Sequence, residues 1–450
     1  MNEELLSYYW KLQRFRKENL CTNDGEPIQV IYPGLLNKDG GPDFLHARIR
    51  IGETLWVGNV ELHSKSSDWN KHGHQHDPAY ANVILHVVYE SDELLDVPFP
   101  ELSLQHFIDP LSAGLMEAWR ASMDPIPCHA LLKENPETLN TLWLDRLMVE
   151  RLEDKSQKIE SLLREVNTNW EAAFFLWMAH YFGLRVNVLP FEMLARSIPW
   201  KLVKKYRNKR DDLEALFQGQ AGLLQTTVRD GFHQSLIERQ RLQRNLHPLE
   251  ALDPSQWKFL RMRPANFPSI RISQFADLFF RYESPLDRFL HSNYLEELES
   301  LLSLQAHEYW GTHSRFGQTN KGLSLTLGKD TRQLLLGNAV LPFLFCYAEN
   351  WSLADKREWV LDAFHRLKPE NNSLIRRWNS LGILANSFAD SQSLITLSRG
   401  YCEKKRCLSC EVGNQLTRPE KSADNSHYDT NEYPSKKVNY EEGAGGRYDQ

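Results

Sequence analysis

The chain has 450 residues, 41% of them hydrophobic and 25% charged, and its formal net charge is −6. A single hydrophobic core stops growing at about 250–300 residues, so this length predicts two or three domains. The negative net charge excludes a chain that is basic throughout, and it leaves only a local basic patch for binding nucleic acid.

The apolar segments and the cysteines indicate the cellular compartment of the protein. The N-terminus, MNEELLSYYWKLQRFRKENL, lacks the continuous apolar stretch of a signal peptide, and no apolar run reaches the ~20 residues that span a bilayer. The six cysteines are few and unevenly spaced, unlike those of a secreted disulfide-rich protein. We therefore predict a cytoplasmic protein without membrane association.

The first hundred or so residues predict a helix followed by a sheet. Apolar residues recur at helical spacing over residues 3–19, and the breaker CTNDGEP follows. Residues 82–90, NVILHVVYE, are mostly apolar and β-branched, which is typical of a central strand buried on both faces. Alternating or β-branched patterns predict further strands over residues 28–32, 45–51, 55–65 and 97–104.

The pattern changes to helical after residue 110. Helical periodicity occurs over residues 142–163, 169–184, 211–245, 272–303, 331–349, 354–366 and 373–385. The last residues are polar and poor in aliphatic side chains, which is typical of disorder. We predict an α+β protein with an N-terminal mixed β-sheet and flanking helix in residues 1–120, a mainly α-helical region in 121–412 and a disordered tail in 413–450.

Acidic and basic side chains gather on one predicted β-hairpin. Side chains alternate along a strand, so Glu61, His63 and Lys65 lie on one face. Asp43 begins the preceding strand, and a hairpin can bring its carboxylate close to Glu61. Two carboxylates near a basic side chain form a usual site for Mg²⁺ or Mn²⁺. The metal activates a water molecule, and the positively charged side chain steadies that water. We predict that Asp43, Glu61, His63 and Lys65 are catalytic, with the two carboxylates holding the metal.

A histidine-rich segment, DWNKHGHQHDPAY, follows the hairpin. In an extended loop His72, His74 and His76 would share one side, a feasible transition-metal site. Alternatively His74 or Asp77 lies beside the two carboxylates, and we add both to the predicted metal ligands. An exposed polar loop is the other interpretation, and we favour it for His72 and His76.

An arginine cluster lies in WKFLRMRPANFPSIRISQFADLFFR. Arg261, Arg263, Asn266 and Arg271 surround a proline-rich turn and have aromatic neighbours. Arginine suits phosphate and aromatic rings suit unstacked bases, so we predict a nucleic-acid-binding surface here. The alternative is that these arginines pair with carboxylates inside a helical bundle.

Three cysteines near the end have the spacing C-x4-C-x2-C. Cys402, Cys407 and Cys410 predict a structural metal site, for which zinc is the default in a reducing compartment. Such a site needs a fourth ligand, and the candidates are Cys128, His129 and Cys21. Three unligated thiols are the alternative.

The hairpin residues resemble the PD-(D/E)XK nuclease superfamily. Pro42-Asp43 opens one strand, Glu61-Leu62-His63 lies on the next, and Glu4 or Glu18 lies in the leading helix. The resemblance implies a restriction-endonuclease-like fold and a metal-dependent phosphodiesterase. His63 stands where the motif has lysine, and Lys65 lies two residues further on the same face, so either the lysine has migrated or the site is inactive. Some members bind an iron–sulfur cluster through three C-terminal cysteines and a distant one, which is the alternative to zinc here.

Over nearly its full length the chain also resembles a bacterial family of unknown function. The segments GPDF, GNVELH, DWNKHGHQHD, RMRPANFPSIR and YCEKKRCLSC carry this resemblance. It implies a bacterial cytoplasmic protein and assigns no activity.

The predicted function is therefore a metal-dependent phosphodiesterase that acts on nucleic acid. One alternative is a non-catalytic nucleic-acid-binding or scaffold protein with a nuclease-like fold. Another is a metal hydrolase that acts on a small substrate through the histidine loop. The sequence leaves open the substrate, the choice between DNA and RNA, the metal at the cysteines and the oligomeric state.

Overall fold

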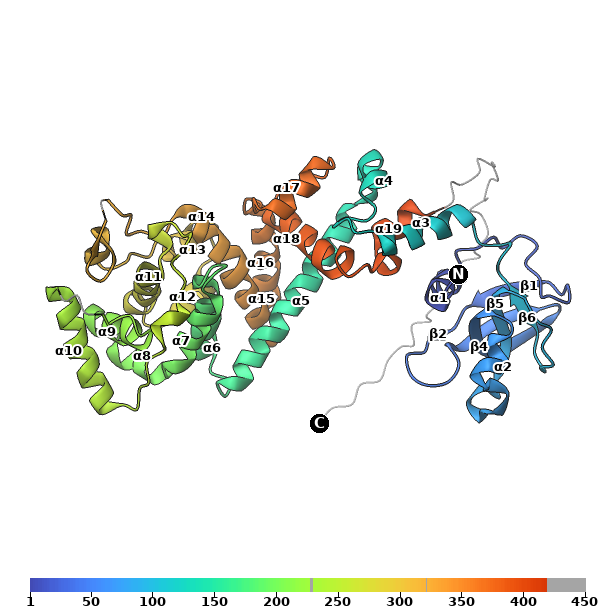
Figure 1. Ribbon diagram of the computed structural model, residues 1–450, viewed down its shortest axis with the longest axis horizontal. Coiled ribbons are helices and arrows are strands. Elements are labelled where there is room, and N and C mark those ends of the chain that lie inside the picture. The colour runs from blue at the N-terminus through green and yellow to red at the C-terminus, as the bar shows by residue number, and fades with distance from the viewer. Residues whose placement is uncertain (227–229, 321, 419–450) are drawn as a thin grey trace, which may run out of the picture. The chain divides into compact units, whose positions relative to one another are not determined.

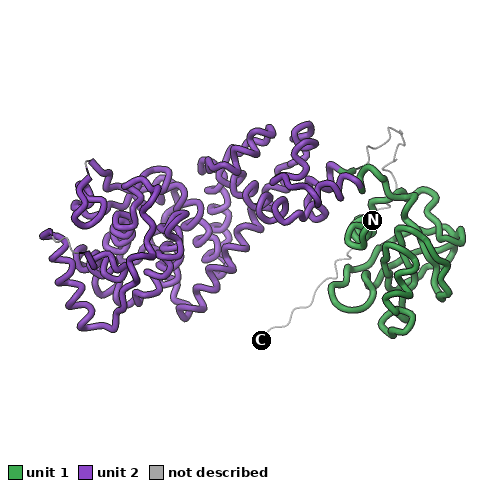
Figure 2. Tube along the Cα trace, in the orientation of Figure 1, with its two compact units in different colours: residues 1–113, 417–450 green, residues 114–416 purple. Residues whose placement is uncertain are grey.

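The chain folds into two compact units in a computed structural model that describes residues 1–226, 230–320 and 322–418 (Figures 1 and 2). Unit 1 comprises residues 1–113 with Thr417 and Arg418, and unit 2 comprises residues 114–416. An N-terminal mixed sheet is followed by many helices, which confirms the α+β class. The predicted boundary at residue 120 falls within helix α3 (Pro110–Ala121). Helix α19 includes part of the predicted tail, and residues 419–450 lie outside the described residues.

Unit 1 is built on a mixed six-stranded sheet. Its strands run in the order β1-β3-β4-β5-β6, and β2 pairs with β3. Strands β1, β2, β3 and β4 pair antiparallel, whereas β5 is parallel to both β4 and β6. The bounds are β1 Ile28–Tyr32, β2 Leu35–Leu36, β3 Phe44–Ile51, β4 Thr54–Lys65, β5 Val83–Glu90 and β6 Glu101–Ser103.

Strand β5 lies inside the sheet, as its composition predicts. Val83 to Val88 are all buried, and β5 has a hydrogen-bonded neighbour on each side. β-branched and aliphatic side chains are stable in such a strand because both faces pack against other elements.

The register of the β3–β4 hairpin positions the site. Phe44 pairs with Val60, so Asp43 and Glu61 are neighbours across the two strands. The register shifts between Phe44 and Ala47, where His46 has a positive φ of 59°. This bulge re-aims the start of β3 and is the type of irregularity that often lies next to functional sites.

Two helices contact β4. Helix α1 (Glu3–Lys11) is capped by the side chain of Asn2, which accepts a hydrogen bond from the amide of Leu5. The prediction that this helix continues to residue 19 is wrong, since the chain turns at Gln13 with a positive φ of 48°. Helix α2 (Asp68–His72) ends at Gly73, which has a φ of 73°. Short 3₁₀ turns follow at His74–His76 and Pro78–Tyr80.

Unit 2 is almost entirely helical (Figure 1). It also contains two short strands and two π-helical segments, Leu336–Val340 and Leu397–Cys402. The strands are β7 His313–Arg315 and β8 Gln318–Thr319. The helices are α4 His129–Glu134, α5 Thr141–Glu165, α6 Trp170–Phe182, α7 Val188–Ser197, α8 Trp200–Tyr206, α9 Arg210–Gln220, α10 Gly231–Leu246, α11 Pro268–Arg281, α12 Pro285–His291, α13 Leu295–Leu301, α14 Lys329–Leu335, α15 Leu341–Asn350, α16 Ala354–Arg366, α17 Ser373–Ser380, α18 Phe388–Thr396 and α19 Glu411–Leu416.

The core of unit 2 forms around α6, which is apolar on nearly all faces and therefore buried. Phe174 and Phe175 of this helix pack against aromatic rings of α11 and α15 and the ring of Phe289. The two longest predicted helices, over residues 211–245 and 272–303, are each divided. The first is broken after α9, before Gly222, which has a φ of 74°. The second is broken after α11, before Pro285 at the start of α12. In the part of the chain that the structure describes, no helix has both the length and the apolar character needed to cross a membrane.

Candidate metal centre

Two carboxylates meet at the open end of the β3–β4 hairpin. The backbone amide of Asp43 donates to Glu61 Oε2 at 3.0 Å, and the amide of Leu62 donates to Asp43 Oδ2 at 3.0 Å. These reciprocal hydrogen bonds hold both side chains in place. The structure thus brings together the two acidic residues that the sequence singles out.

Both carboxyl groups are hard to ionise where they lie. Burial raises the pKa of Asp43 to about 6, and it raises the pKa of Glu61 to about 8 with a further contribution from the charge of Asp43. The charge of Glu3 in α1 raises both pKa values as well, so Glu3 is a leading-helix carboxylate that acts on this pair. Bound cations reverse this effect because they stabilise the ionised carboxylates. The donor set therefore fits a metal ion.

Three histidines complete a cluster beside Glu61. One nitrogen each of His63, His72 and His74 lie within 4.8 Å of one another. Glu61 Oε1 is 3.6 Å from His63 Nε2 and 3.3 Å from His74 Nε2. Three imidazoles and a carboxylate at such separations can hold one transition-metal ion.

The turn at Gly73 creates this cluster. The chain does not run extended through the histidine segment. Because it reverses at Gly73, His72 at the end of α2 and His74 both approach His63. His72 is exposed, as favoured, but it ends helix α2 instead of lying in a loop, and its Nδ1 lies 3.1 Å from His63 Nε2. His76 is exposed and lies outside the cluster.

A buried relay sets the orientation of His63. Its Nδ1 lies 2.8 Å from Nε2 of His86, and His86 Nδ1 lies 3.0 Å from Oε2 of Glu101. A carboxylate accepts only from N–H, so Glu101 accepts a hydrogen bond from His86 Nδ1–H. When His86 Nε2 carries no proton it accepts from His63 Nδ1–H, and the lone pair of His63 Nε2 then faces the cluster. Burial and the neighbouring histidines lower the pKa of His63 to about 3, so it is the neutral imidazole that a metal requires.

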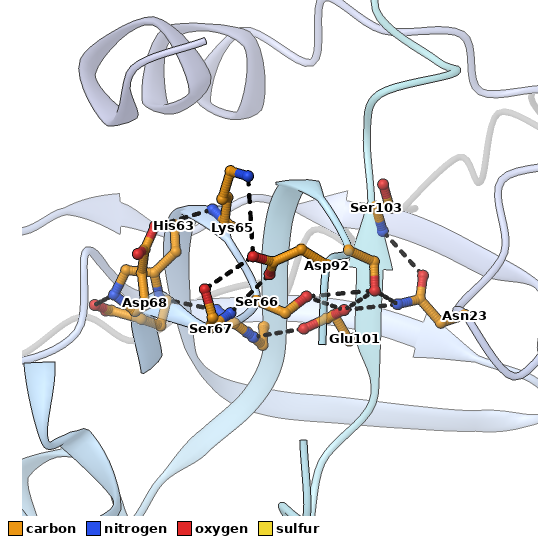
Figure 3. Close-up of polar contacts among 12 residues, drawn as sticks. Asn23, His63, Lys65, Ser66, Ser67, Asp68, Asp92, Glu101 and Ser103 are labelled. Atoms are coloured by element: carbon orange, nitrogen blue, oxygen red, sulfur yellow. Dashed lines mark hydrogen bonds and ion pairs between the residues drawn. The ribbon is translucent and has the colours of Figure 1, made fainter. Parts of the chain in front are cut away.

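Glu101 is itself held by several donors (Figure 3). Its Oε1 accepts from Asn23 at 2.7 Å, Ser66 at 2.7 Å and Ser91 at 2.8 Å. Burial favours the neutral acid, but the hydrogen bonds from His86, Ser66 and Ser91 outweigh it, and the pKa of Glu101 is lowered. The relay therefore ends in an ionised carboxylate.

Sequence reasoning missed His86 and Glu101. The available signal was a single histidine within the apolar strand β5, because a polar group buried there requires a hydrogen-bond partner. No local pattern connects it to Glu101, which lies on β6.

Two other predicted site residues lie outside the cluster. The amine of Lys65 is 3.4 Å from Glu90 Oε2 and 4.0 Å from Asp92 Oδ2, and Figure 3 shows it beside Asp92. Asp77 caps the following 3₁₀ turn by accepting from the amide of Ala79 at 2.9 Å. The structure therefore does not bring Lys65 or Asp77 to the metal ligands.

The predicted arginine surface is divided in unit 2. Arg271 is 4% exposed, and its guanidinium donates to Gln274 at 3.0 Å, Thr331 at 3.2 Å and Asn266. Burial lowers the pKa of Arg271 to about 10. Arg261 and Arg263 are exposed. Arg271 is thus an internal residue paired with amides and a hydroxyl, whereas the other two lie at the surface.

The predicted cysteine ligands lie in one region of unit 2, but among the described residues their sulfur atoms do not form a group close enough to share one ion, as the histidines do. Cys402, Cys407 and Cys410 are buried, and half-buried Cys128 packs into the same apolar cluster as Cys402 and Cys410. Burial raises the pKa of Cys402 well above its usual value, and the thiols of Cys410, Cys128 and Cys407 raise it further. Of the three candidate fourth ligands, Cys128 is the one that packs in the same apolar cluster as Cys402 and Cys410. The other candidates lie elsewhere, Cys21 in unit 1 and His129 hydrogen-bonded to the carbonyl of Ile126.

The hydrogen-bonded chain from Glu101 through His86 to His63 should affect metal binding. Glu101→Gln removes the charge that sets the tautomers of His86 and His63, so metal affinity at the histidine cluster should fall by about 10–100-fold. Titration of metal-free protein with Mn²⁺ or Zn²⁺ measures this affinity. Asp92→Asn is the matched control, since Asp92 is a surface carboxylate that accepts from Ser67 and is not part of the relay. Equal affinities of wild type and Glu101→Gln would show that the relay does not act on the metal.

No curated protein and no solved structure matches the chain. The family described as a protein of unknown function (DUF2851) matches residues 3–373. This match contains the whole histidine and carboxylate cluster and ends before the three C-terminal cysteines. It confirms the predicted membership in a family of unknown function, whereas the likeness to nucleases and the bacterial, cytoplasmic origin stay predictions. The chain belongs to the DUF2851 family.

Proposed function

We propose that unit 1 is a metal-dependent hydrolase that cleaves phosphodiester bonds of nucleic acid. The observation that supports this best is the cluster of His63, His72 and His74 beside Glu61, which is hydrogen-bonded to the backbone of Asp43. Perturbed carboxylates next to a ligand cluster are typical of sites that handle charge and protons. The nuclease-like order of the elements around the hairpin adds to the proposal.

The ligand set favours Mn²⁺ or Zn²⁺ over Mg²⁺. Imidazole nitrogen suits transition metals, whereas Mg²⁺ prefers oxygen ligands and retains water. His63, His72, His74 and Glu61 would hold the ion. Such an ion, when bound, polarises a phosphoryl oxygen and lowers the pKa of a water ligand.

The chain's own residues supply proton handling and orientation. Asp43 is half-buried and has a pKa of about 6, so it can accept the proton of an attacking water near neutral pH. Tyr80 stacks on His74 with ring centres 3.9 Å apart and fixes the plane of that imidazole. Buried Trp69 contacts the rings of His63, His74 and His86 and excludes water from their inner side.

A second candidate function is hydrolysis of a small substrate at the same metal. Lys65, the cation of the nuclease-like motif, is paired with Glu90 and Asp92 and not with the carboxylate site. Without that lysine, the site has fewer positive charges with which to bind the phosphates of a nucleic-acid backbone.

The proposal is tested with metal-free protein reloaded with Mn²⁺, Zn²⁺ or Mg²⁺. Labelled single- and double-stranded DNA and RNA are the test substrates, and bis(p-nitrophenyl) phosphate serves as a generic phosphodiester. We expect cleavage of an oligonucleotide with Mn²⁺ or Zn²⁺ and none in chelator. Hydrolysis of the generic ester alone would select the small-substrate function. Binding of oligonucleotides without any hydrolysis would reject catalysis and indicate the non-catalytic alternative.

A further inference from the structure

The helical unit contains a cavity of about 410 Å³ with four basic side chains in its wall. Arg151, Lys155 and Lys158 come from α5, and Arg399 comes from the π-helical segment after α18. Helices α5 and α18 pack against each other, so residues that are far apart in sequence share this wall (Figure 1). This cavity lies within unit 2 and is separate from the histidine cluster of unit 1.

The acidic side chains of the wall, Asp154 and Glu370, stabilise the charges of Arg151 and Lys155 only from a distance, without forming an ion pair. Asp154 is exposed, and Glu370 is occupied by amides. Glu370 Oε1 accepts from Asn338 at 2.8 Å and Gln392 at 2.7 Å, and Oε2 accepts from Asn372 at 3.1 Å. Within the described residues, none of the four basic groups lies within ion-pair distance of a carboxylate.

Two of the basic side chains lie deep in the protein, and burial lowers the pKa of Arg151 and, much further, that of Lys155. Lys155 is buried, and its amine donates to the carbonyl and to Oδ1 of Asn338 at 2.7 and 3.1 Å. The buried Nε of Arg151 has no hydrogen-bond partner among the described residues. A buried cationic group without a counter-ion is destabilising, because burial removes the water that solvates its charge. A bound anion would remove this cost because it supplies the missing acceptor and the opposite charge.

The backbone around the cavity is also unusual. The two π-helical segments of unit 2 each contribute a lining residue, Asn338 from Leu336–Val340 and Arg399 from Leu397–Cys402. Such segments are rare and occur frequently at functional sites. They re-aim side chains that a regular helix would direct elsewhere.

We propose that this cavity binds a phosphoryl group, either of inorganic phosphate or of a small phosphomonoester such as a mononucleotide. Guanidinium groups match phosphate in geometry and can form paired hydrogen bonds with it. The wall has four Arg or Lys side chains and two Asp or Glu side chains, and this surplus of basic groups suits a dianion better than a monocarboxylate. The volume lies in the range of small-molecule sites, about 300–1,000 Å³. Tyr181, Leu184, Leu334 and Ile395 provide apolar wall for the remainder of a phosphomonoester.

Calorimetric titration of the full chain tests this site. The probes are inorganic phosphate, AMP, a short single-stranded oligonucleotide, and acetate as a monovalent control. We expect phosphate or AMP to bind at least 10-fold more tightly than acetate. Arg399→Met should weaken this binding about 10–100-fold, since a charged hydrogen bond contributes about 1.5–3 kcal/mol and 1.4 kcal/mol is a factor of ten.

Two variants control for damage to the fold. Arg164→Met changes an exposed arginine on the same helix, outside the cavity, and should leave binding unchanged. Asp154→Asn removes a negative charge from the wall and should tighten binding. A gain of affinity cannot result from unfolding, so this variant keeps the test informative if Arg399→Met is unstable.

The outcomes separate the sources of the phosphoryl group. Tighter binding of AMP than of phosphate identifies a phosphomonoester, and the reverse order identifies inorganic phosphate. Binding of the oligonucleotide alone would overturn the proposal in favour of a nucleic-acid surface. Absence of binding by phosphate and AMP, or equal binding by wild type and Arg399→Met, would also overturn it. Metal-free Glu61→Gln should bind phosphate and AMP like metal-free wild type, so this site and the proposed hydrolase activity can fail independently.

Discussion

Glu61→Gln is expected to abolish metal-dependent hydrolysis while the fold of unit 1 persists, and Asp43→Asn is expected to do the same. Glu61 is near His63, His74 and Asp43, and Gln keeps its size while it removes the charge that a cation requires. Loss of a residue that supports ligands already costs about 10–100-fold in activity or affinity, so loss of a direct ligand should cost at least about 100-fold. The assay is oligonucleotide cleavage in saturating Mn²⁺ or Zn²⁺, with metal affinity measured in parallel.

The pH dependence distinguishes a lost ligand from a damaged fold. Because the pKa of folded Glu61 is raised to about 8, its contribution to stability is present below its unfolded pKa and is lost as pH rises through about 8. Metal-free Glu61→Gln cannot ionise there and should melt at the same temperature as wild type or higher at pH 8.5. In wild type, metal affinity should increase as pH rises towards 8, since binding displaces a proton, and Glu61→Gln should lack this part of the dependence.

Glu90→Gln is the matched control for these variants. Glu90 ends β5 and pairs with Lys65, outside the ligand cluster, so its substitution should change neither cleavage nor metal affinity. Full cleavage by both Glu61→Gln and Asp43→Asn would reject the assignment of the metal centre.

Cys410→Ser is expected to release a metal ion and to loosen the segment near residues 395–415. Cys410 is buried in the same apolar cluster as Cys402, and Cys128 at the start of α4 packs against this cluster. The apparent free energy of a structural zinc site is about 10–16 kcal/mol in small domains, and metal binding there stabilises the fold directly. A substantial part of that contribution should be lost from this segment.

Metal analysis and hydrogen exchange measure this effect on protein prepared without an affinity tag. Wild type should contain one zinc, or iron with a brown chromophore, and Cys410→Ser should contain neither at this site. Exchange should accelerate near residues 395–415, while the sheet of unit 1 keeps its protection. Cys21→Ser in unit 1 is the control and should retain the metal. Wild-type protein that contains neither zinc nor iron would show that these cysteines are ordinary buried thiols.

Local patterns in the sequence determined most of the secondary structure. Strands β1, β3, β4 and β5 agree with the predicted segments, as do α5 and α6, because apolar periodicity depends only on near neighbours. The pairing of Asp43 with Glu61 was accessible only in part. The hairpin brings the two strand ends together, but the register of Ile51 with Thr54 would place Asp43 opposite Leu62, and the bulge between Phe44 and Ala47 moves it to Glu61. The family membership likewise follows from the sequence alone.

Only the tertiary structure decided which side chains join these residues. His72 enters the cluster because Gly73 reverses the chain, and Lys65 is excluded because Glu90 and Asp92 from the far end of β5 draw its amine. His86 and Glu101 act on His63 across parallel strands whose register no local pattern reveals.

The same limit applies to unit 2. Cys128 packs with Cys402 and Cys410, and α5 joins the π-helical segment with Arg399, across more than 200 residues of chain. A helix pattern shows which face is apolar and does not show which other helix covers it. The free energy that brings such segments together is spread over the whole core. Packing therefore determined which residues line the cavity and surround the cysteines of unit 2, and no single motif could predict them.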